Sequence, residues 1–410
     1  MNPAEPTIAH HTLSNGLKTV HRQYPGLTEY CGVAVNAGSR DETPDRHGLA
    51  HFVEHTIFKG TSTHSANYIL NRMESVGGEL NAYTTKEETM VYAAMPAGNA
   101  DRAARLIADL VSMSQFPLRQ IDKEREVVAD EIDSYLDSPG ELVFDLFEDR
   151  IYDGNALGHN ILGTVESIRT FTPAICRDWL TDNYAADNMA VFYLGPMPAD
   201  KFFRMAERHF GTIAPTCTPR MRDTPPASKP FTVIRDMHSH QAHTVIGAQL
   251  PGMYSDMRWA LALTTNIIGG PGMNSRLNVA LREKRGLVYT VDATTSLMTD
   301  TGLTSIYFGC DPADTDRCLS VISRELSRLA DSPMSPRLLD AAKRQYLGQL
   351  ALSGDNKEQT ALNMARATLF YGRASLPGET AERISAITAD ELRQAATAIA
   401  TAMHHRLTIA

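Results

Sequence analysis

The 410-residue sequence has few of the features that mark secreted or membrane proteins. Its five cysteines are odd in number and widely scattered, which is typical of reduced thiols and disfavours a disulfide framework or a thiolate metal cluster. No apolar run approaches the roughly 18 residues that a membrane span needs. Residues 1–21 show no secretory signal pattern. We therefore expect a cytoplasmic protein with no membrane partner.

Basic residues are also in short supply. Lys and Arg total 39 against 48 Asp and Glu, which gives a formal net charge of −9. A chain without basic excess has few cations available to neutralise phosphates, which disfavours a polyanion, so we expect no nucleic-acid partner. The remaining composition, 43% hydrophobic and 21% charged, is that of an ordinary globular protein long enough for two domains.

A proline-rich stretch divides the chain nearly in half. Residues 215–230 contain five prolines and little periodicity, so they can continue neither a helix nor a central strand. We place an interdomain linker at residues 218–230. The predicted N-terminal domain is then residues 1–217, and the C-terminal domain is residues 231–410.

The two halves look like diverged copies, because each has strand-like segments followed by two helical segments. In the first half, the patterns predict strands at residues 31–37, 80–85 and 89–95 and helices at 49–58, 100–114 and 120–137. In the second half, they predict strands at residues 244–250, 287–295 and 302–309 and helices at 257–268, 314–330 and 336–351. This order predicts an α+β fold of two homologous domains, each a largely antiparallel sheet covered by helices on one face.

The strongest chemical signal is residues 47–60 (HGLAHFVEHTIFKG), where histidines and a glutamate interrupt an apolar segment. Burying His51, Glu54 and His55 side by side is unfavourable unless a bound cation compensates them. On a helix, His51 and His55 lie on one face and can bind the same Zn²⁺, while Glu54 can accept a proton from water. The alternative is an amphipathic surface helix with solvated polar residues, which the apolar neighbours disfavour.

A third ligand is expected from the helix predicted at residues 120–137. Glu124 and Glu131, seven residues apart, fall on or beside its apolar stripe. One of them could bind the metal while the other holds a ligating histidine. Periodicity does not decide which glutamate binds directly, and both could instead be solvated helix charges.

These segments resemble the pitrilysin/insulinase metallopeptidases, the inverted-motif zinc proteases, and most closely their short two-domain branch related to mitochondrial processing peptidase. The resemblance spans nearly the whole chain. It is carried by residues 51–61 (HFVEHTIFKGT), 77–84 (GGELNAYT), 124–131 (EREVVADE) and 281–289 (LREKRGLVY).

The resemblance implies a role for each residue of the motif. It implies that His51, His55 and Glu131 bind one Zn²⁺ per chain, that Glu54 is the general base, and that Glu124 is the carboxylate behind a ligating histidine. Glu131 follows His55 by 76 residues, as the family spacing requires. The implied activity is endoproteolysis of peptides or unfolded polypeptide segments in an enclosed chamber.

In the second half, Arg282 and Tyr289 match the family's substrate-clamping pair. A guanidinium can hold a peptide carbonyl, and a phenol can donate to the oxyanion that forms during hydrolysis. In the family this pair lies far from the zinc of its own chain and reaches the site of a facing subunit, which implies a homodimer. The alternative is a non-catalytic or partner-dependent peptide-binding subunit of a heterodimer with the same fold.

Residues 78–85 alternate as a strand does, and an edge strand could pair with an extended peptide through its backbone. The resemblance favours this role and places Asn81 and Ala82 nearest the scissile bond, with Tyr83 beside them. An internal hairpin without a binding role is the alternative.

Overall fold

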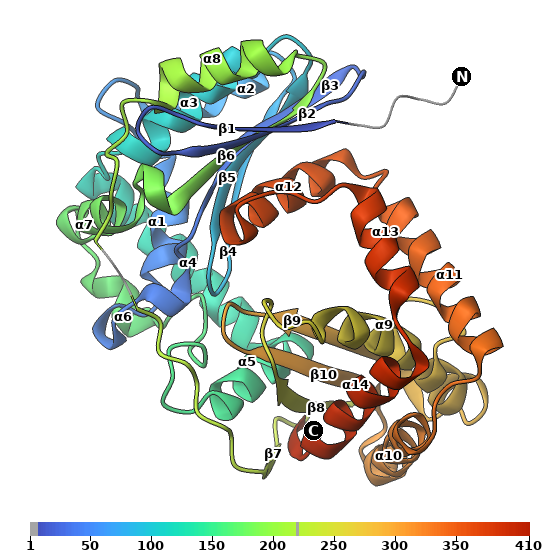
Figure 1. Cartoon of the computed structure of the whole chain (residues 1–410). Helices are drawn as coiled ribbons and strands as arrows, with labels where there is room; N and C mark the ends of the chain where they lie inside the picture. Colours follow the sequence, from blue (N-terminus) through green and yellow to red (C-terminus); the bar gives the residue numbers. More distant parts are fainter. Residues whose placement is uncertain (1–6, 219–220) are drawn as a thin grey trace. The chain divides into compact units, whose positions relative to one another are not determined.

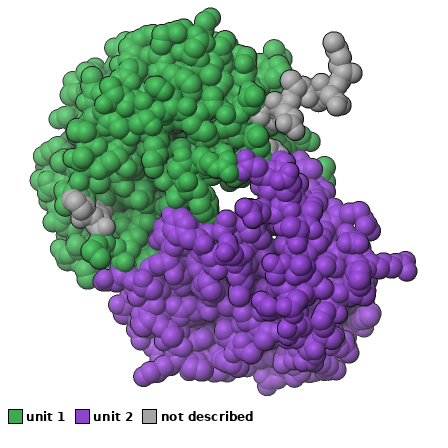
Figure 2. All heavy atoms as spheres, viewed as in Figure 1, with its two compact units in different colours: residues 1–133, 159–222, 352–377 green, residues 134–158, 223–351, 378–410 purple. Residues whose placement is uncertain are grey.

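The computed structural model describes residues 7–218 and 221–410; residues 1–6 of the predicted N-terminal domain and 219–220 of the predicted linker lie outside the described residues. Contacts divide the chain into two compact units (Figure 2). Unit 1 takes in residues 1–133, 159–222 and 352–377, and unit 2 residues 134–158, 223–351 and 378–410.

Unit 1 is built on a sheet with the strand order β1-β2-β6-β3-β5-β4 (Figure 1). Neighbouring strands are antiparallel except β2 and β6, which run parallel. The strand β4 therefore lies at one edge of this sheet. The strands are β1 (Ile8–Thr12), β2 (Lys18–Gln23), β3 (Thr28–Val35), β4 (Glu79–Thr84), β5 (Thr89–Pro96) and β6 (Met189–Gly195).

Both faces of this sheet are covered. Alternate residues of β3, Cys31, Val33 and Val35, are buried in a core that includes residues of α1, α3 and α8. Ala34 points to the opposite face, where it packs with residues of α12. The helices assigned wholly or mostly to unit 1 are α1 (Leu49–Ile57), α2 (Ala66–Glu74), α3 (Ala100–Met113), α4 (Leu118–Leu136), α6 (Val165–Thr170), α7 (Pro173–Asn183), α8 (Ala199–Phe210) and α12 (Lys357–Tyr371).

Unit 2 repeats this arrangement in the order β7-β11-β8-β10-β9, again with one parallel pair, β7 and β11. The strand order matches β2-β6-β3-β5-β4 of unit 1 position for position. The edge strand β9 therefore occupies the place that β4 has in unit 1. The strands are β7 (Phe231–Arg235), β8 (Ala242–Leu250), β9 (Val288–Leu297), β10 (Gly302–Cys310) and β11 (His405–Ile409).

The sheet of unit 2 is also covered on both faces. Residues of α9, α10 and α14 form the core on one face, and residues of α5 pack with Val245, Leu303 and Leu407 on the other. The helices assigned wholly or mostly to unit 2 are α5 (Pro139–Ile151), α9 (Arg258–Gly269), α10 (Thr315–Asp331), α11 (Pro336–Ser353), α13 (Pro377–Ala386) and α14 (Ala389–Ala402).

The units differ from the predicted domain boundaries in two segments. Residues 134–158 precede the linker but belong to unit 2, whereas residues 352–377 follow it and belong to unit 1. The physical reason is burial, because α5 and α12 each bury their apolar residues against the sheet built by the other half of the chain. In the predicted linker, residues 221–230 form neither helix nor strand.

The predicted fold class is confirmed, since both units combine helices with a largely antiparallel sheet. The one addition is the helix that covers the second face of each sheet, α12 in unit 1 and α5 in unit 2. Among the described residues, no helix is long and apolar enough to cross a membrane.

Candidate metal centre and active site

The helix α1 carries the histidine pair and the glutamate of the opening motif. Most of its residues are buried in the core of unit 1, and His51 itself is 8% exposed. The rings of His51 and His55 lie on one side of the helix, with centroids 4.5 Å apart. Glu54 and His55 on the same helix are partly buried.

The helix α4 brings Glu131 to this pair. Its carboxylate oxygens lie 3.9 Å from His51 Nε2 and 3.6 Å from His55 Nε2. One donor atom from each of the three residues lies within 4.8 Å of the others. Two imidazole nitrogens and one carboxylate oxygen are a set that zinc accepts in catalytic sites, where one position stays open. The donor set of His51, His55 and Glu131 therefore fits Zn²⁺.

Glu124 lies behind His55 and is only 7% exposed. One carboxylate oxygen is 3.2 Å from His55 Nδ1, and the other is 2.8 Å from the Lys59 ammonium. Burial alone would raise the pKa of Glu124, but His55 and Lys59 outweigh it and lower that pKa. An ionised Glu124 accepts a hydrogen bond from the Nδ1–H group of His55. The lone pair of this ring then lies on Nε2, on the side of Glu131.

The two helices thus separate the glutamates that periodicity left undecided. Glu131 faces the Nε2 atoms of both histidines, whereas Glu124 contacts the far side of one ring. Lys59 was missed as a contributor to the site, although it stands in the segment 51–61 that carries the resemblance. Its role depends on a contact with α4, which a local pattern does not reveal.

Burial also sets the charge of the histidines. It lowers the pKa of His51 to about 3, with the nearby His55 as a second cause, so His51 is neutral near pH 7 and its nitrogen can bind a metal. Burial lowers the pKa of His55 as well, but the carboxylates of Glu124, Glu54 and Glu131 outweigh this effect and raise it. The site therefore attracts positive charge.

Glu54 lies on α1 between the two histidines in sequence, next to the edge strand β4. Burial raises the pKa of Glu54, while the Thr84 hydroxyl and His55 act in the opposite direction. The Thr84 hydroxyl donates a hydrogen bond of 2.8 Å to Glu54 Oε2. A carboxylate with raised pKa, held by one donor, is suited to accept and return a proton. Thr84 was also missed from the sequence, where only strand alternation pointed to it.

The predicted substrate-binding residues all lie on β4. Ala82 packs against the core of unit 1, on the side of α1, whereas Tyr83 packs against the cluster that includes α12. Asn81 stands opposite Tyr92 of β5 in the ladder. The prediction that this segment is an edge strand is confirmed by the sheet order.

Arg282 and Tyr289 belong to unit 2, whereas His51, His55 and Glu131 belong to unit 1. Arg282 lies in a π-helical segment, η4 (Asn278–Glu283), and Tyr289 lies on the edge strand β9. Both side chains are exposed, Tyr289 to 67%. Short π-helical segments are rare and occur often at functional sites.

Known proteins resemble this chain in sequence. Residues 20–165 match the family model described as insulinase (peptidase family M16), and residues 170–346 match the peptidase M16 inactive domain. An uncharacterised zinc protease of Streptomyces coelicolor is 30% identical over 400 residues, which cover 95% of this chain and 86% of that protein. The beta subunit of the mitochondrial processing peptidase of Bos taurus is 29% identical over 396 residues, covering 94% and 80%.

Solved structures with lower identity show the same fold. The crystal structure of a protease from Helicobacter pylori has a TM-score of 0.90 at 19% identity and covers 99% of each chain. A peptidase M16 inactive domain from Pseudomonas fluorescens has a TM-score of 0.90 at 18% identity and covers 98% of each chain.

Proposed function

Because the chain belongs to the insulinase (M16) family of peptidases, we propose that it is a zinc-dependent endopeptidase that hydrolyses peptides or unfolded polypeptide segments. The observation that carries this proposal is the convergence of His51, His55 and Glu131 next to Glu54. Relatives named as zinc proteases support the metal and the reaction class. The ligand group accommodates one Zn²⁺ per chain.

The chemistry is divided between the metal and the protein. When bound, Zn²⁺ polarises the scissile carbonyl and lowers the pKa of water at the site. Glu54 takes the proton from the attacking water and returns it to the leaving amine. Thr84 holds one oxygen of Glu54 and leaves the other free for this transfer. Glu124 keeps His55 in the tautomer that a metal ligand requires.

The edge strand β4 is the proposed binding site for the substrate backbone. Within the part of the chain that the structure describes, β4 pairs with β5 only, so its outer edge has backbone groups available for an extended peptide. In this arrangement Asn81, Ala82 and Tyr83 contact the residues around the scissile bond. Backbone pairing selects flexible, extended chains rather than particular side chains.

We further propose a homodimer that encloses a chamber, with Arg282 and Tyr289 of each chain acting at the site of the other. Mixing Glu54→Gln and Arg282→Ala chains tests this assignment, since each variant alone lacks one part of every site. If the clamp acts between chains, a mixed dimer regains one intact site, and an equimolar mixture recovers about a quarter of wild-type activity. No recovery after verified subunit exchange would overturn the arrangement.

A second candidate is a partner-dependent subunit, because a relative bears the name of a subunit, the beta subunit of a processing peptidase. This candidate predicts that the purified chain binds zinc but hydrolyses peptides only after a second, different chain is added.

The first test of the proposed function is zinc content together with cleavage of a quenched fluorogenic peptide library. Glu54→Gln should retain zinc but lose about 10²- to 10⁴-fold in kcat, the range that general acid–base catalysis contributes. Glu126→Gln, at an exposed position on α4, is the matched control and should behave like wild type. Full activity of the Glu54→Gln chain would overturn the role of Glu54.

A further inference from the structure

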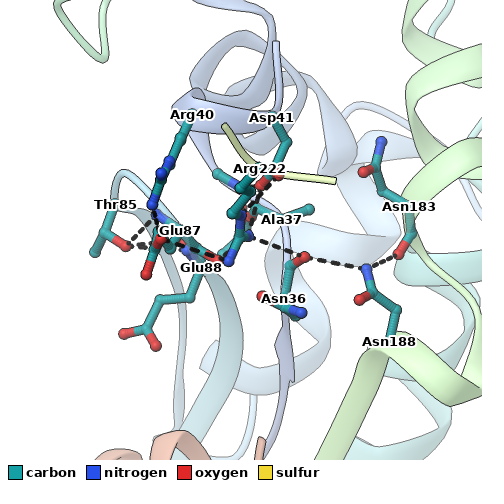
Figure 3. Close-up of polar contacts among 12 residues, drawn as sticks. Asn36, Ala37, Arg40, Asp41, Thr85, Glu87, Glu88, Asn183, Asn188 and Arg222 are labelled. Atoms are coloured by element: carbon teal, nitrogen blue, oxygen red, sulfur yellow. Dashed lines mark hydrogen bonds and ion pairs between the residues drawn. The ribbon is translucent and has the colours of Figure 1, made fainter. Parts of the chain in front are cut away.

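A buried ion cluster in unit 1 includes Arg222 (Figure 3). Arg222 is the last residue of the segment 159–222 of this unit. The Arg222 side chain is 14% exposed. Its Nε and Nη2 donate to the two carboxylate oxygens of Asp41 at 2.9 and 2.8 Å. Nη2 also donates to the backbone carbonyl of Glu87 at 3.1 Å. The cluster contains none of the proposed metal ligands.

A second guanidinium completes the cluster. Arg40 Nη1 lies 2.6 Å from Glu87 Oε1, and Arg222 Nη1 lies 3.6 Å from the same oxygen. Arg40 and Glu87 are almost fully buried, with side chains 1% and 4% exposed. Two carboxylates thus face two guanidiniums, and loss of either cation would leave an excess of buried negative charge.

The cluster joins two chain segments that also pair through their backbones. One is η1 (Ser39–Asp41), and the other is the turn at residues 85–88 between β4 and β5. The Ser39 N–H donates to the Thr85 carbonyl at 3.1 Å, and the Arg40 N–H donates to the Lys86 carbonyl at 2.8 Å. Arg222 comes from a third, distant segment and binds both (Figure 3).

The first of these segments precedes α1, the helix that carries His51 and His55. Glu42 follows η1, and its buried carboxylate accepts hydrogen bonds from the N–H groups of Gly48 at 2.8 Å and Ala50 at 2.7 Å. These groups belong to the N-terminal end of α1, where a carboxylate is favourable. Holding Asp41 in place therefore also holds the residue that caps α1.

The second segment leads to the proposed general base. Thr84 is the last residue of β4 and immediately precedes the turn, which is closed by a 2.8 Å hydrogen bond from the Thr85 N–H to the Glu88 carbonyl. The Thr84 hydroxyl in turn donates to Glu54. A displacement of the turn would therefore move the donor that orients the Glu54 carboxylate.

We propose that Arg222 is a positioning residue for Glu54, acting through the 85–88 turn and Thr84; the inference rests on the proposed function. Arg222 touches neither the metal ligands nor the edge of β4, so its loss should reduce kcat more than it raises KM. A misplacement of a catalytic group by about 1 Å costs up to roughly 10²-fold, so we expect a 10- to 100-fold loss in kcat for Arg222→Met with zinc retained.

A double-mutant cycle separates positioning from general destabilisation. Thr84→Val should lower kcat by a similar factor, and the double variant should be no slower than the slower single variant, because both changes remove the same interaction. Arg222→Lys keeps one charged donor and should recover part of kcat. Arg102→Met is the matched control. Arg102 is also half-buried in unit 1, but it donates to the backbone carbonyl of Arg72 on α2 and to the hydroxyl of Ser75, which follows α2. Multiplied losses in the double variant, or wild-type kcat in Arg222→Met, would overturn the proposal.

Hydrogen–deuterium exchange of the metal-free chains gives a readout that does not depend on activity. Arg222→Met should speed exchange of the Arg40 and Thr85 amides by at least tenfold and leave α8 unchanged. If the wild-type chain hydrolyses no peptide, the proposed function fails while exchange still tests the contact. Unchanged exchange at both amides would overturn the positioning role of Arg222. If Arg222→Met does not fold, Arg222→Gln and Arg222→Lys carry the same cycle and the same exchange measurement.

Discussion

Each unit has a pair of helices at the corresponding place beside its sheet, α1 and α4 in unit 1 and α9 and α11 in unit 2. The side chains that connect the two helices differ between the units. In unit 1, α1 follows β3 and meets α4 through imidazoles and carboxylates. In unit 2, α9 follows β8, which has the place of β3 in the strand order, and α9 meets α11 through amides. The Asn266 amide donates to Gln349 Oε1 at 2.8 Å.

A second amide pair extends the contact in unit 2. Asn274 and Gln345 donate to each other at 2.8 and 3.1 Å. The sequence of α9, RWALALTTNIIG, contains no histidine and no carboxylate. Amides satisfy each other as neutral donors and acceptors, so this junction requires no cation.

The difference separates what the fold needs from what the reaction needs. The contacts described for this junction in unit 2 are made by neutral amides, so the fold alone does not require two histidines and two glutamates at the corresponding place in unit 1. Gathering such groups costs stability unless a cation binds. The proposed metal binding accounts for the charged junction in unit 1.

Copying the amide chemistry of unit 2 into unit 1 should have the largest effect. Glu131→Gln removes one anionic ligand, so we expect zinc content near zero and no measurable peptide hydrolysis. The Glu131 side chain is 43% exposed, and the free energy of unfolding of the metal-free chain should change by about 0.5 kcal/mol or less. Zinc by elemental analysis and urea unfolding check both points. Glu126→Gln on the same helix is the control, and a Glu131→Gln chain that keeps zinc and activity would refute the ligand assignment.

Part of what unit 1 and unit 2 share was readable from local sequence patterns, whereas the parallel pairs β2–β6 and β7–β11 were not predicted. Alternation predicted β4 and β5, and other local patterns predicted β8, β9, β10, α3, α4, α10 and α11 near their observed bounds. The apolar segment around His51, Glu54 and His55 likewise predicted the helix α1.

The exchange of α5 and α12 could not be predicted in this way. An amphipathic pattern states which face of a helix is buried but not against which sheet. Contacts between distant residues were equally hidden: Arg222 and Asp41 are 181 residues apart, and Thr84 and Glu54 are 30 apart. Glu124 and Glu131 fell on or beside one apolar stripe, so periodicity did not separate them. The resemblance implied different roles, and the packing of α4 on α1 gives them different contacts.

The pH dependence of metal-free stability gives a smaller effect with a defined sign. His51 has its pKa lowered from 6.5 to about 3 by burial, so between these values the unfolded chain binds a proton that the folded chain does not. Stability is therefore lost as the pH falls below 6.5, by about 1.4 kcal/mol per pH unit for this group. His55 acts in the opposite sense, since its raised pKa stabilises the folded state below pH 6.5.

The amide variant His51→Asn isolates the first of these contributions. Between pH 6.5 and 5.5, urea unfolding of the metal-free variant should lose about 1 kcal/mol less than the wild type. His404→Asn, at an exposed position in unit 2, is the control. Equal losses in His51→Asn and wild type would show that His51 is not held neutral in the folded chain.

A change in the amide junction of unit 2 should affect stability but not activity. Asn266→Ala removes the donor to Gln349 Oε1, and a half-buried acceptor left without its partner costs about 1 kcal/mol in free energy of unfolding. Zinc content and kcat should stay at wild-type values, because the amide junction serves the fold of unit 2 alone. Urea unfolding measured beside zinc content distinguishes the two effects. A loss of zinc in this variant would mean that the neutral junction supports the metal site as well, and the separation between a structural and a chemical unit would then be wrong.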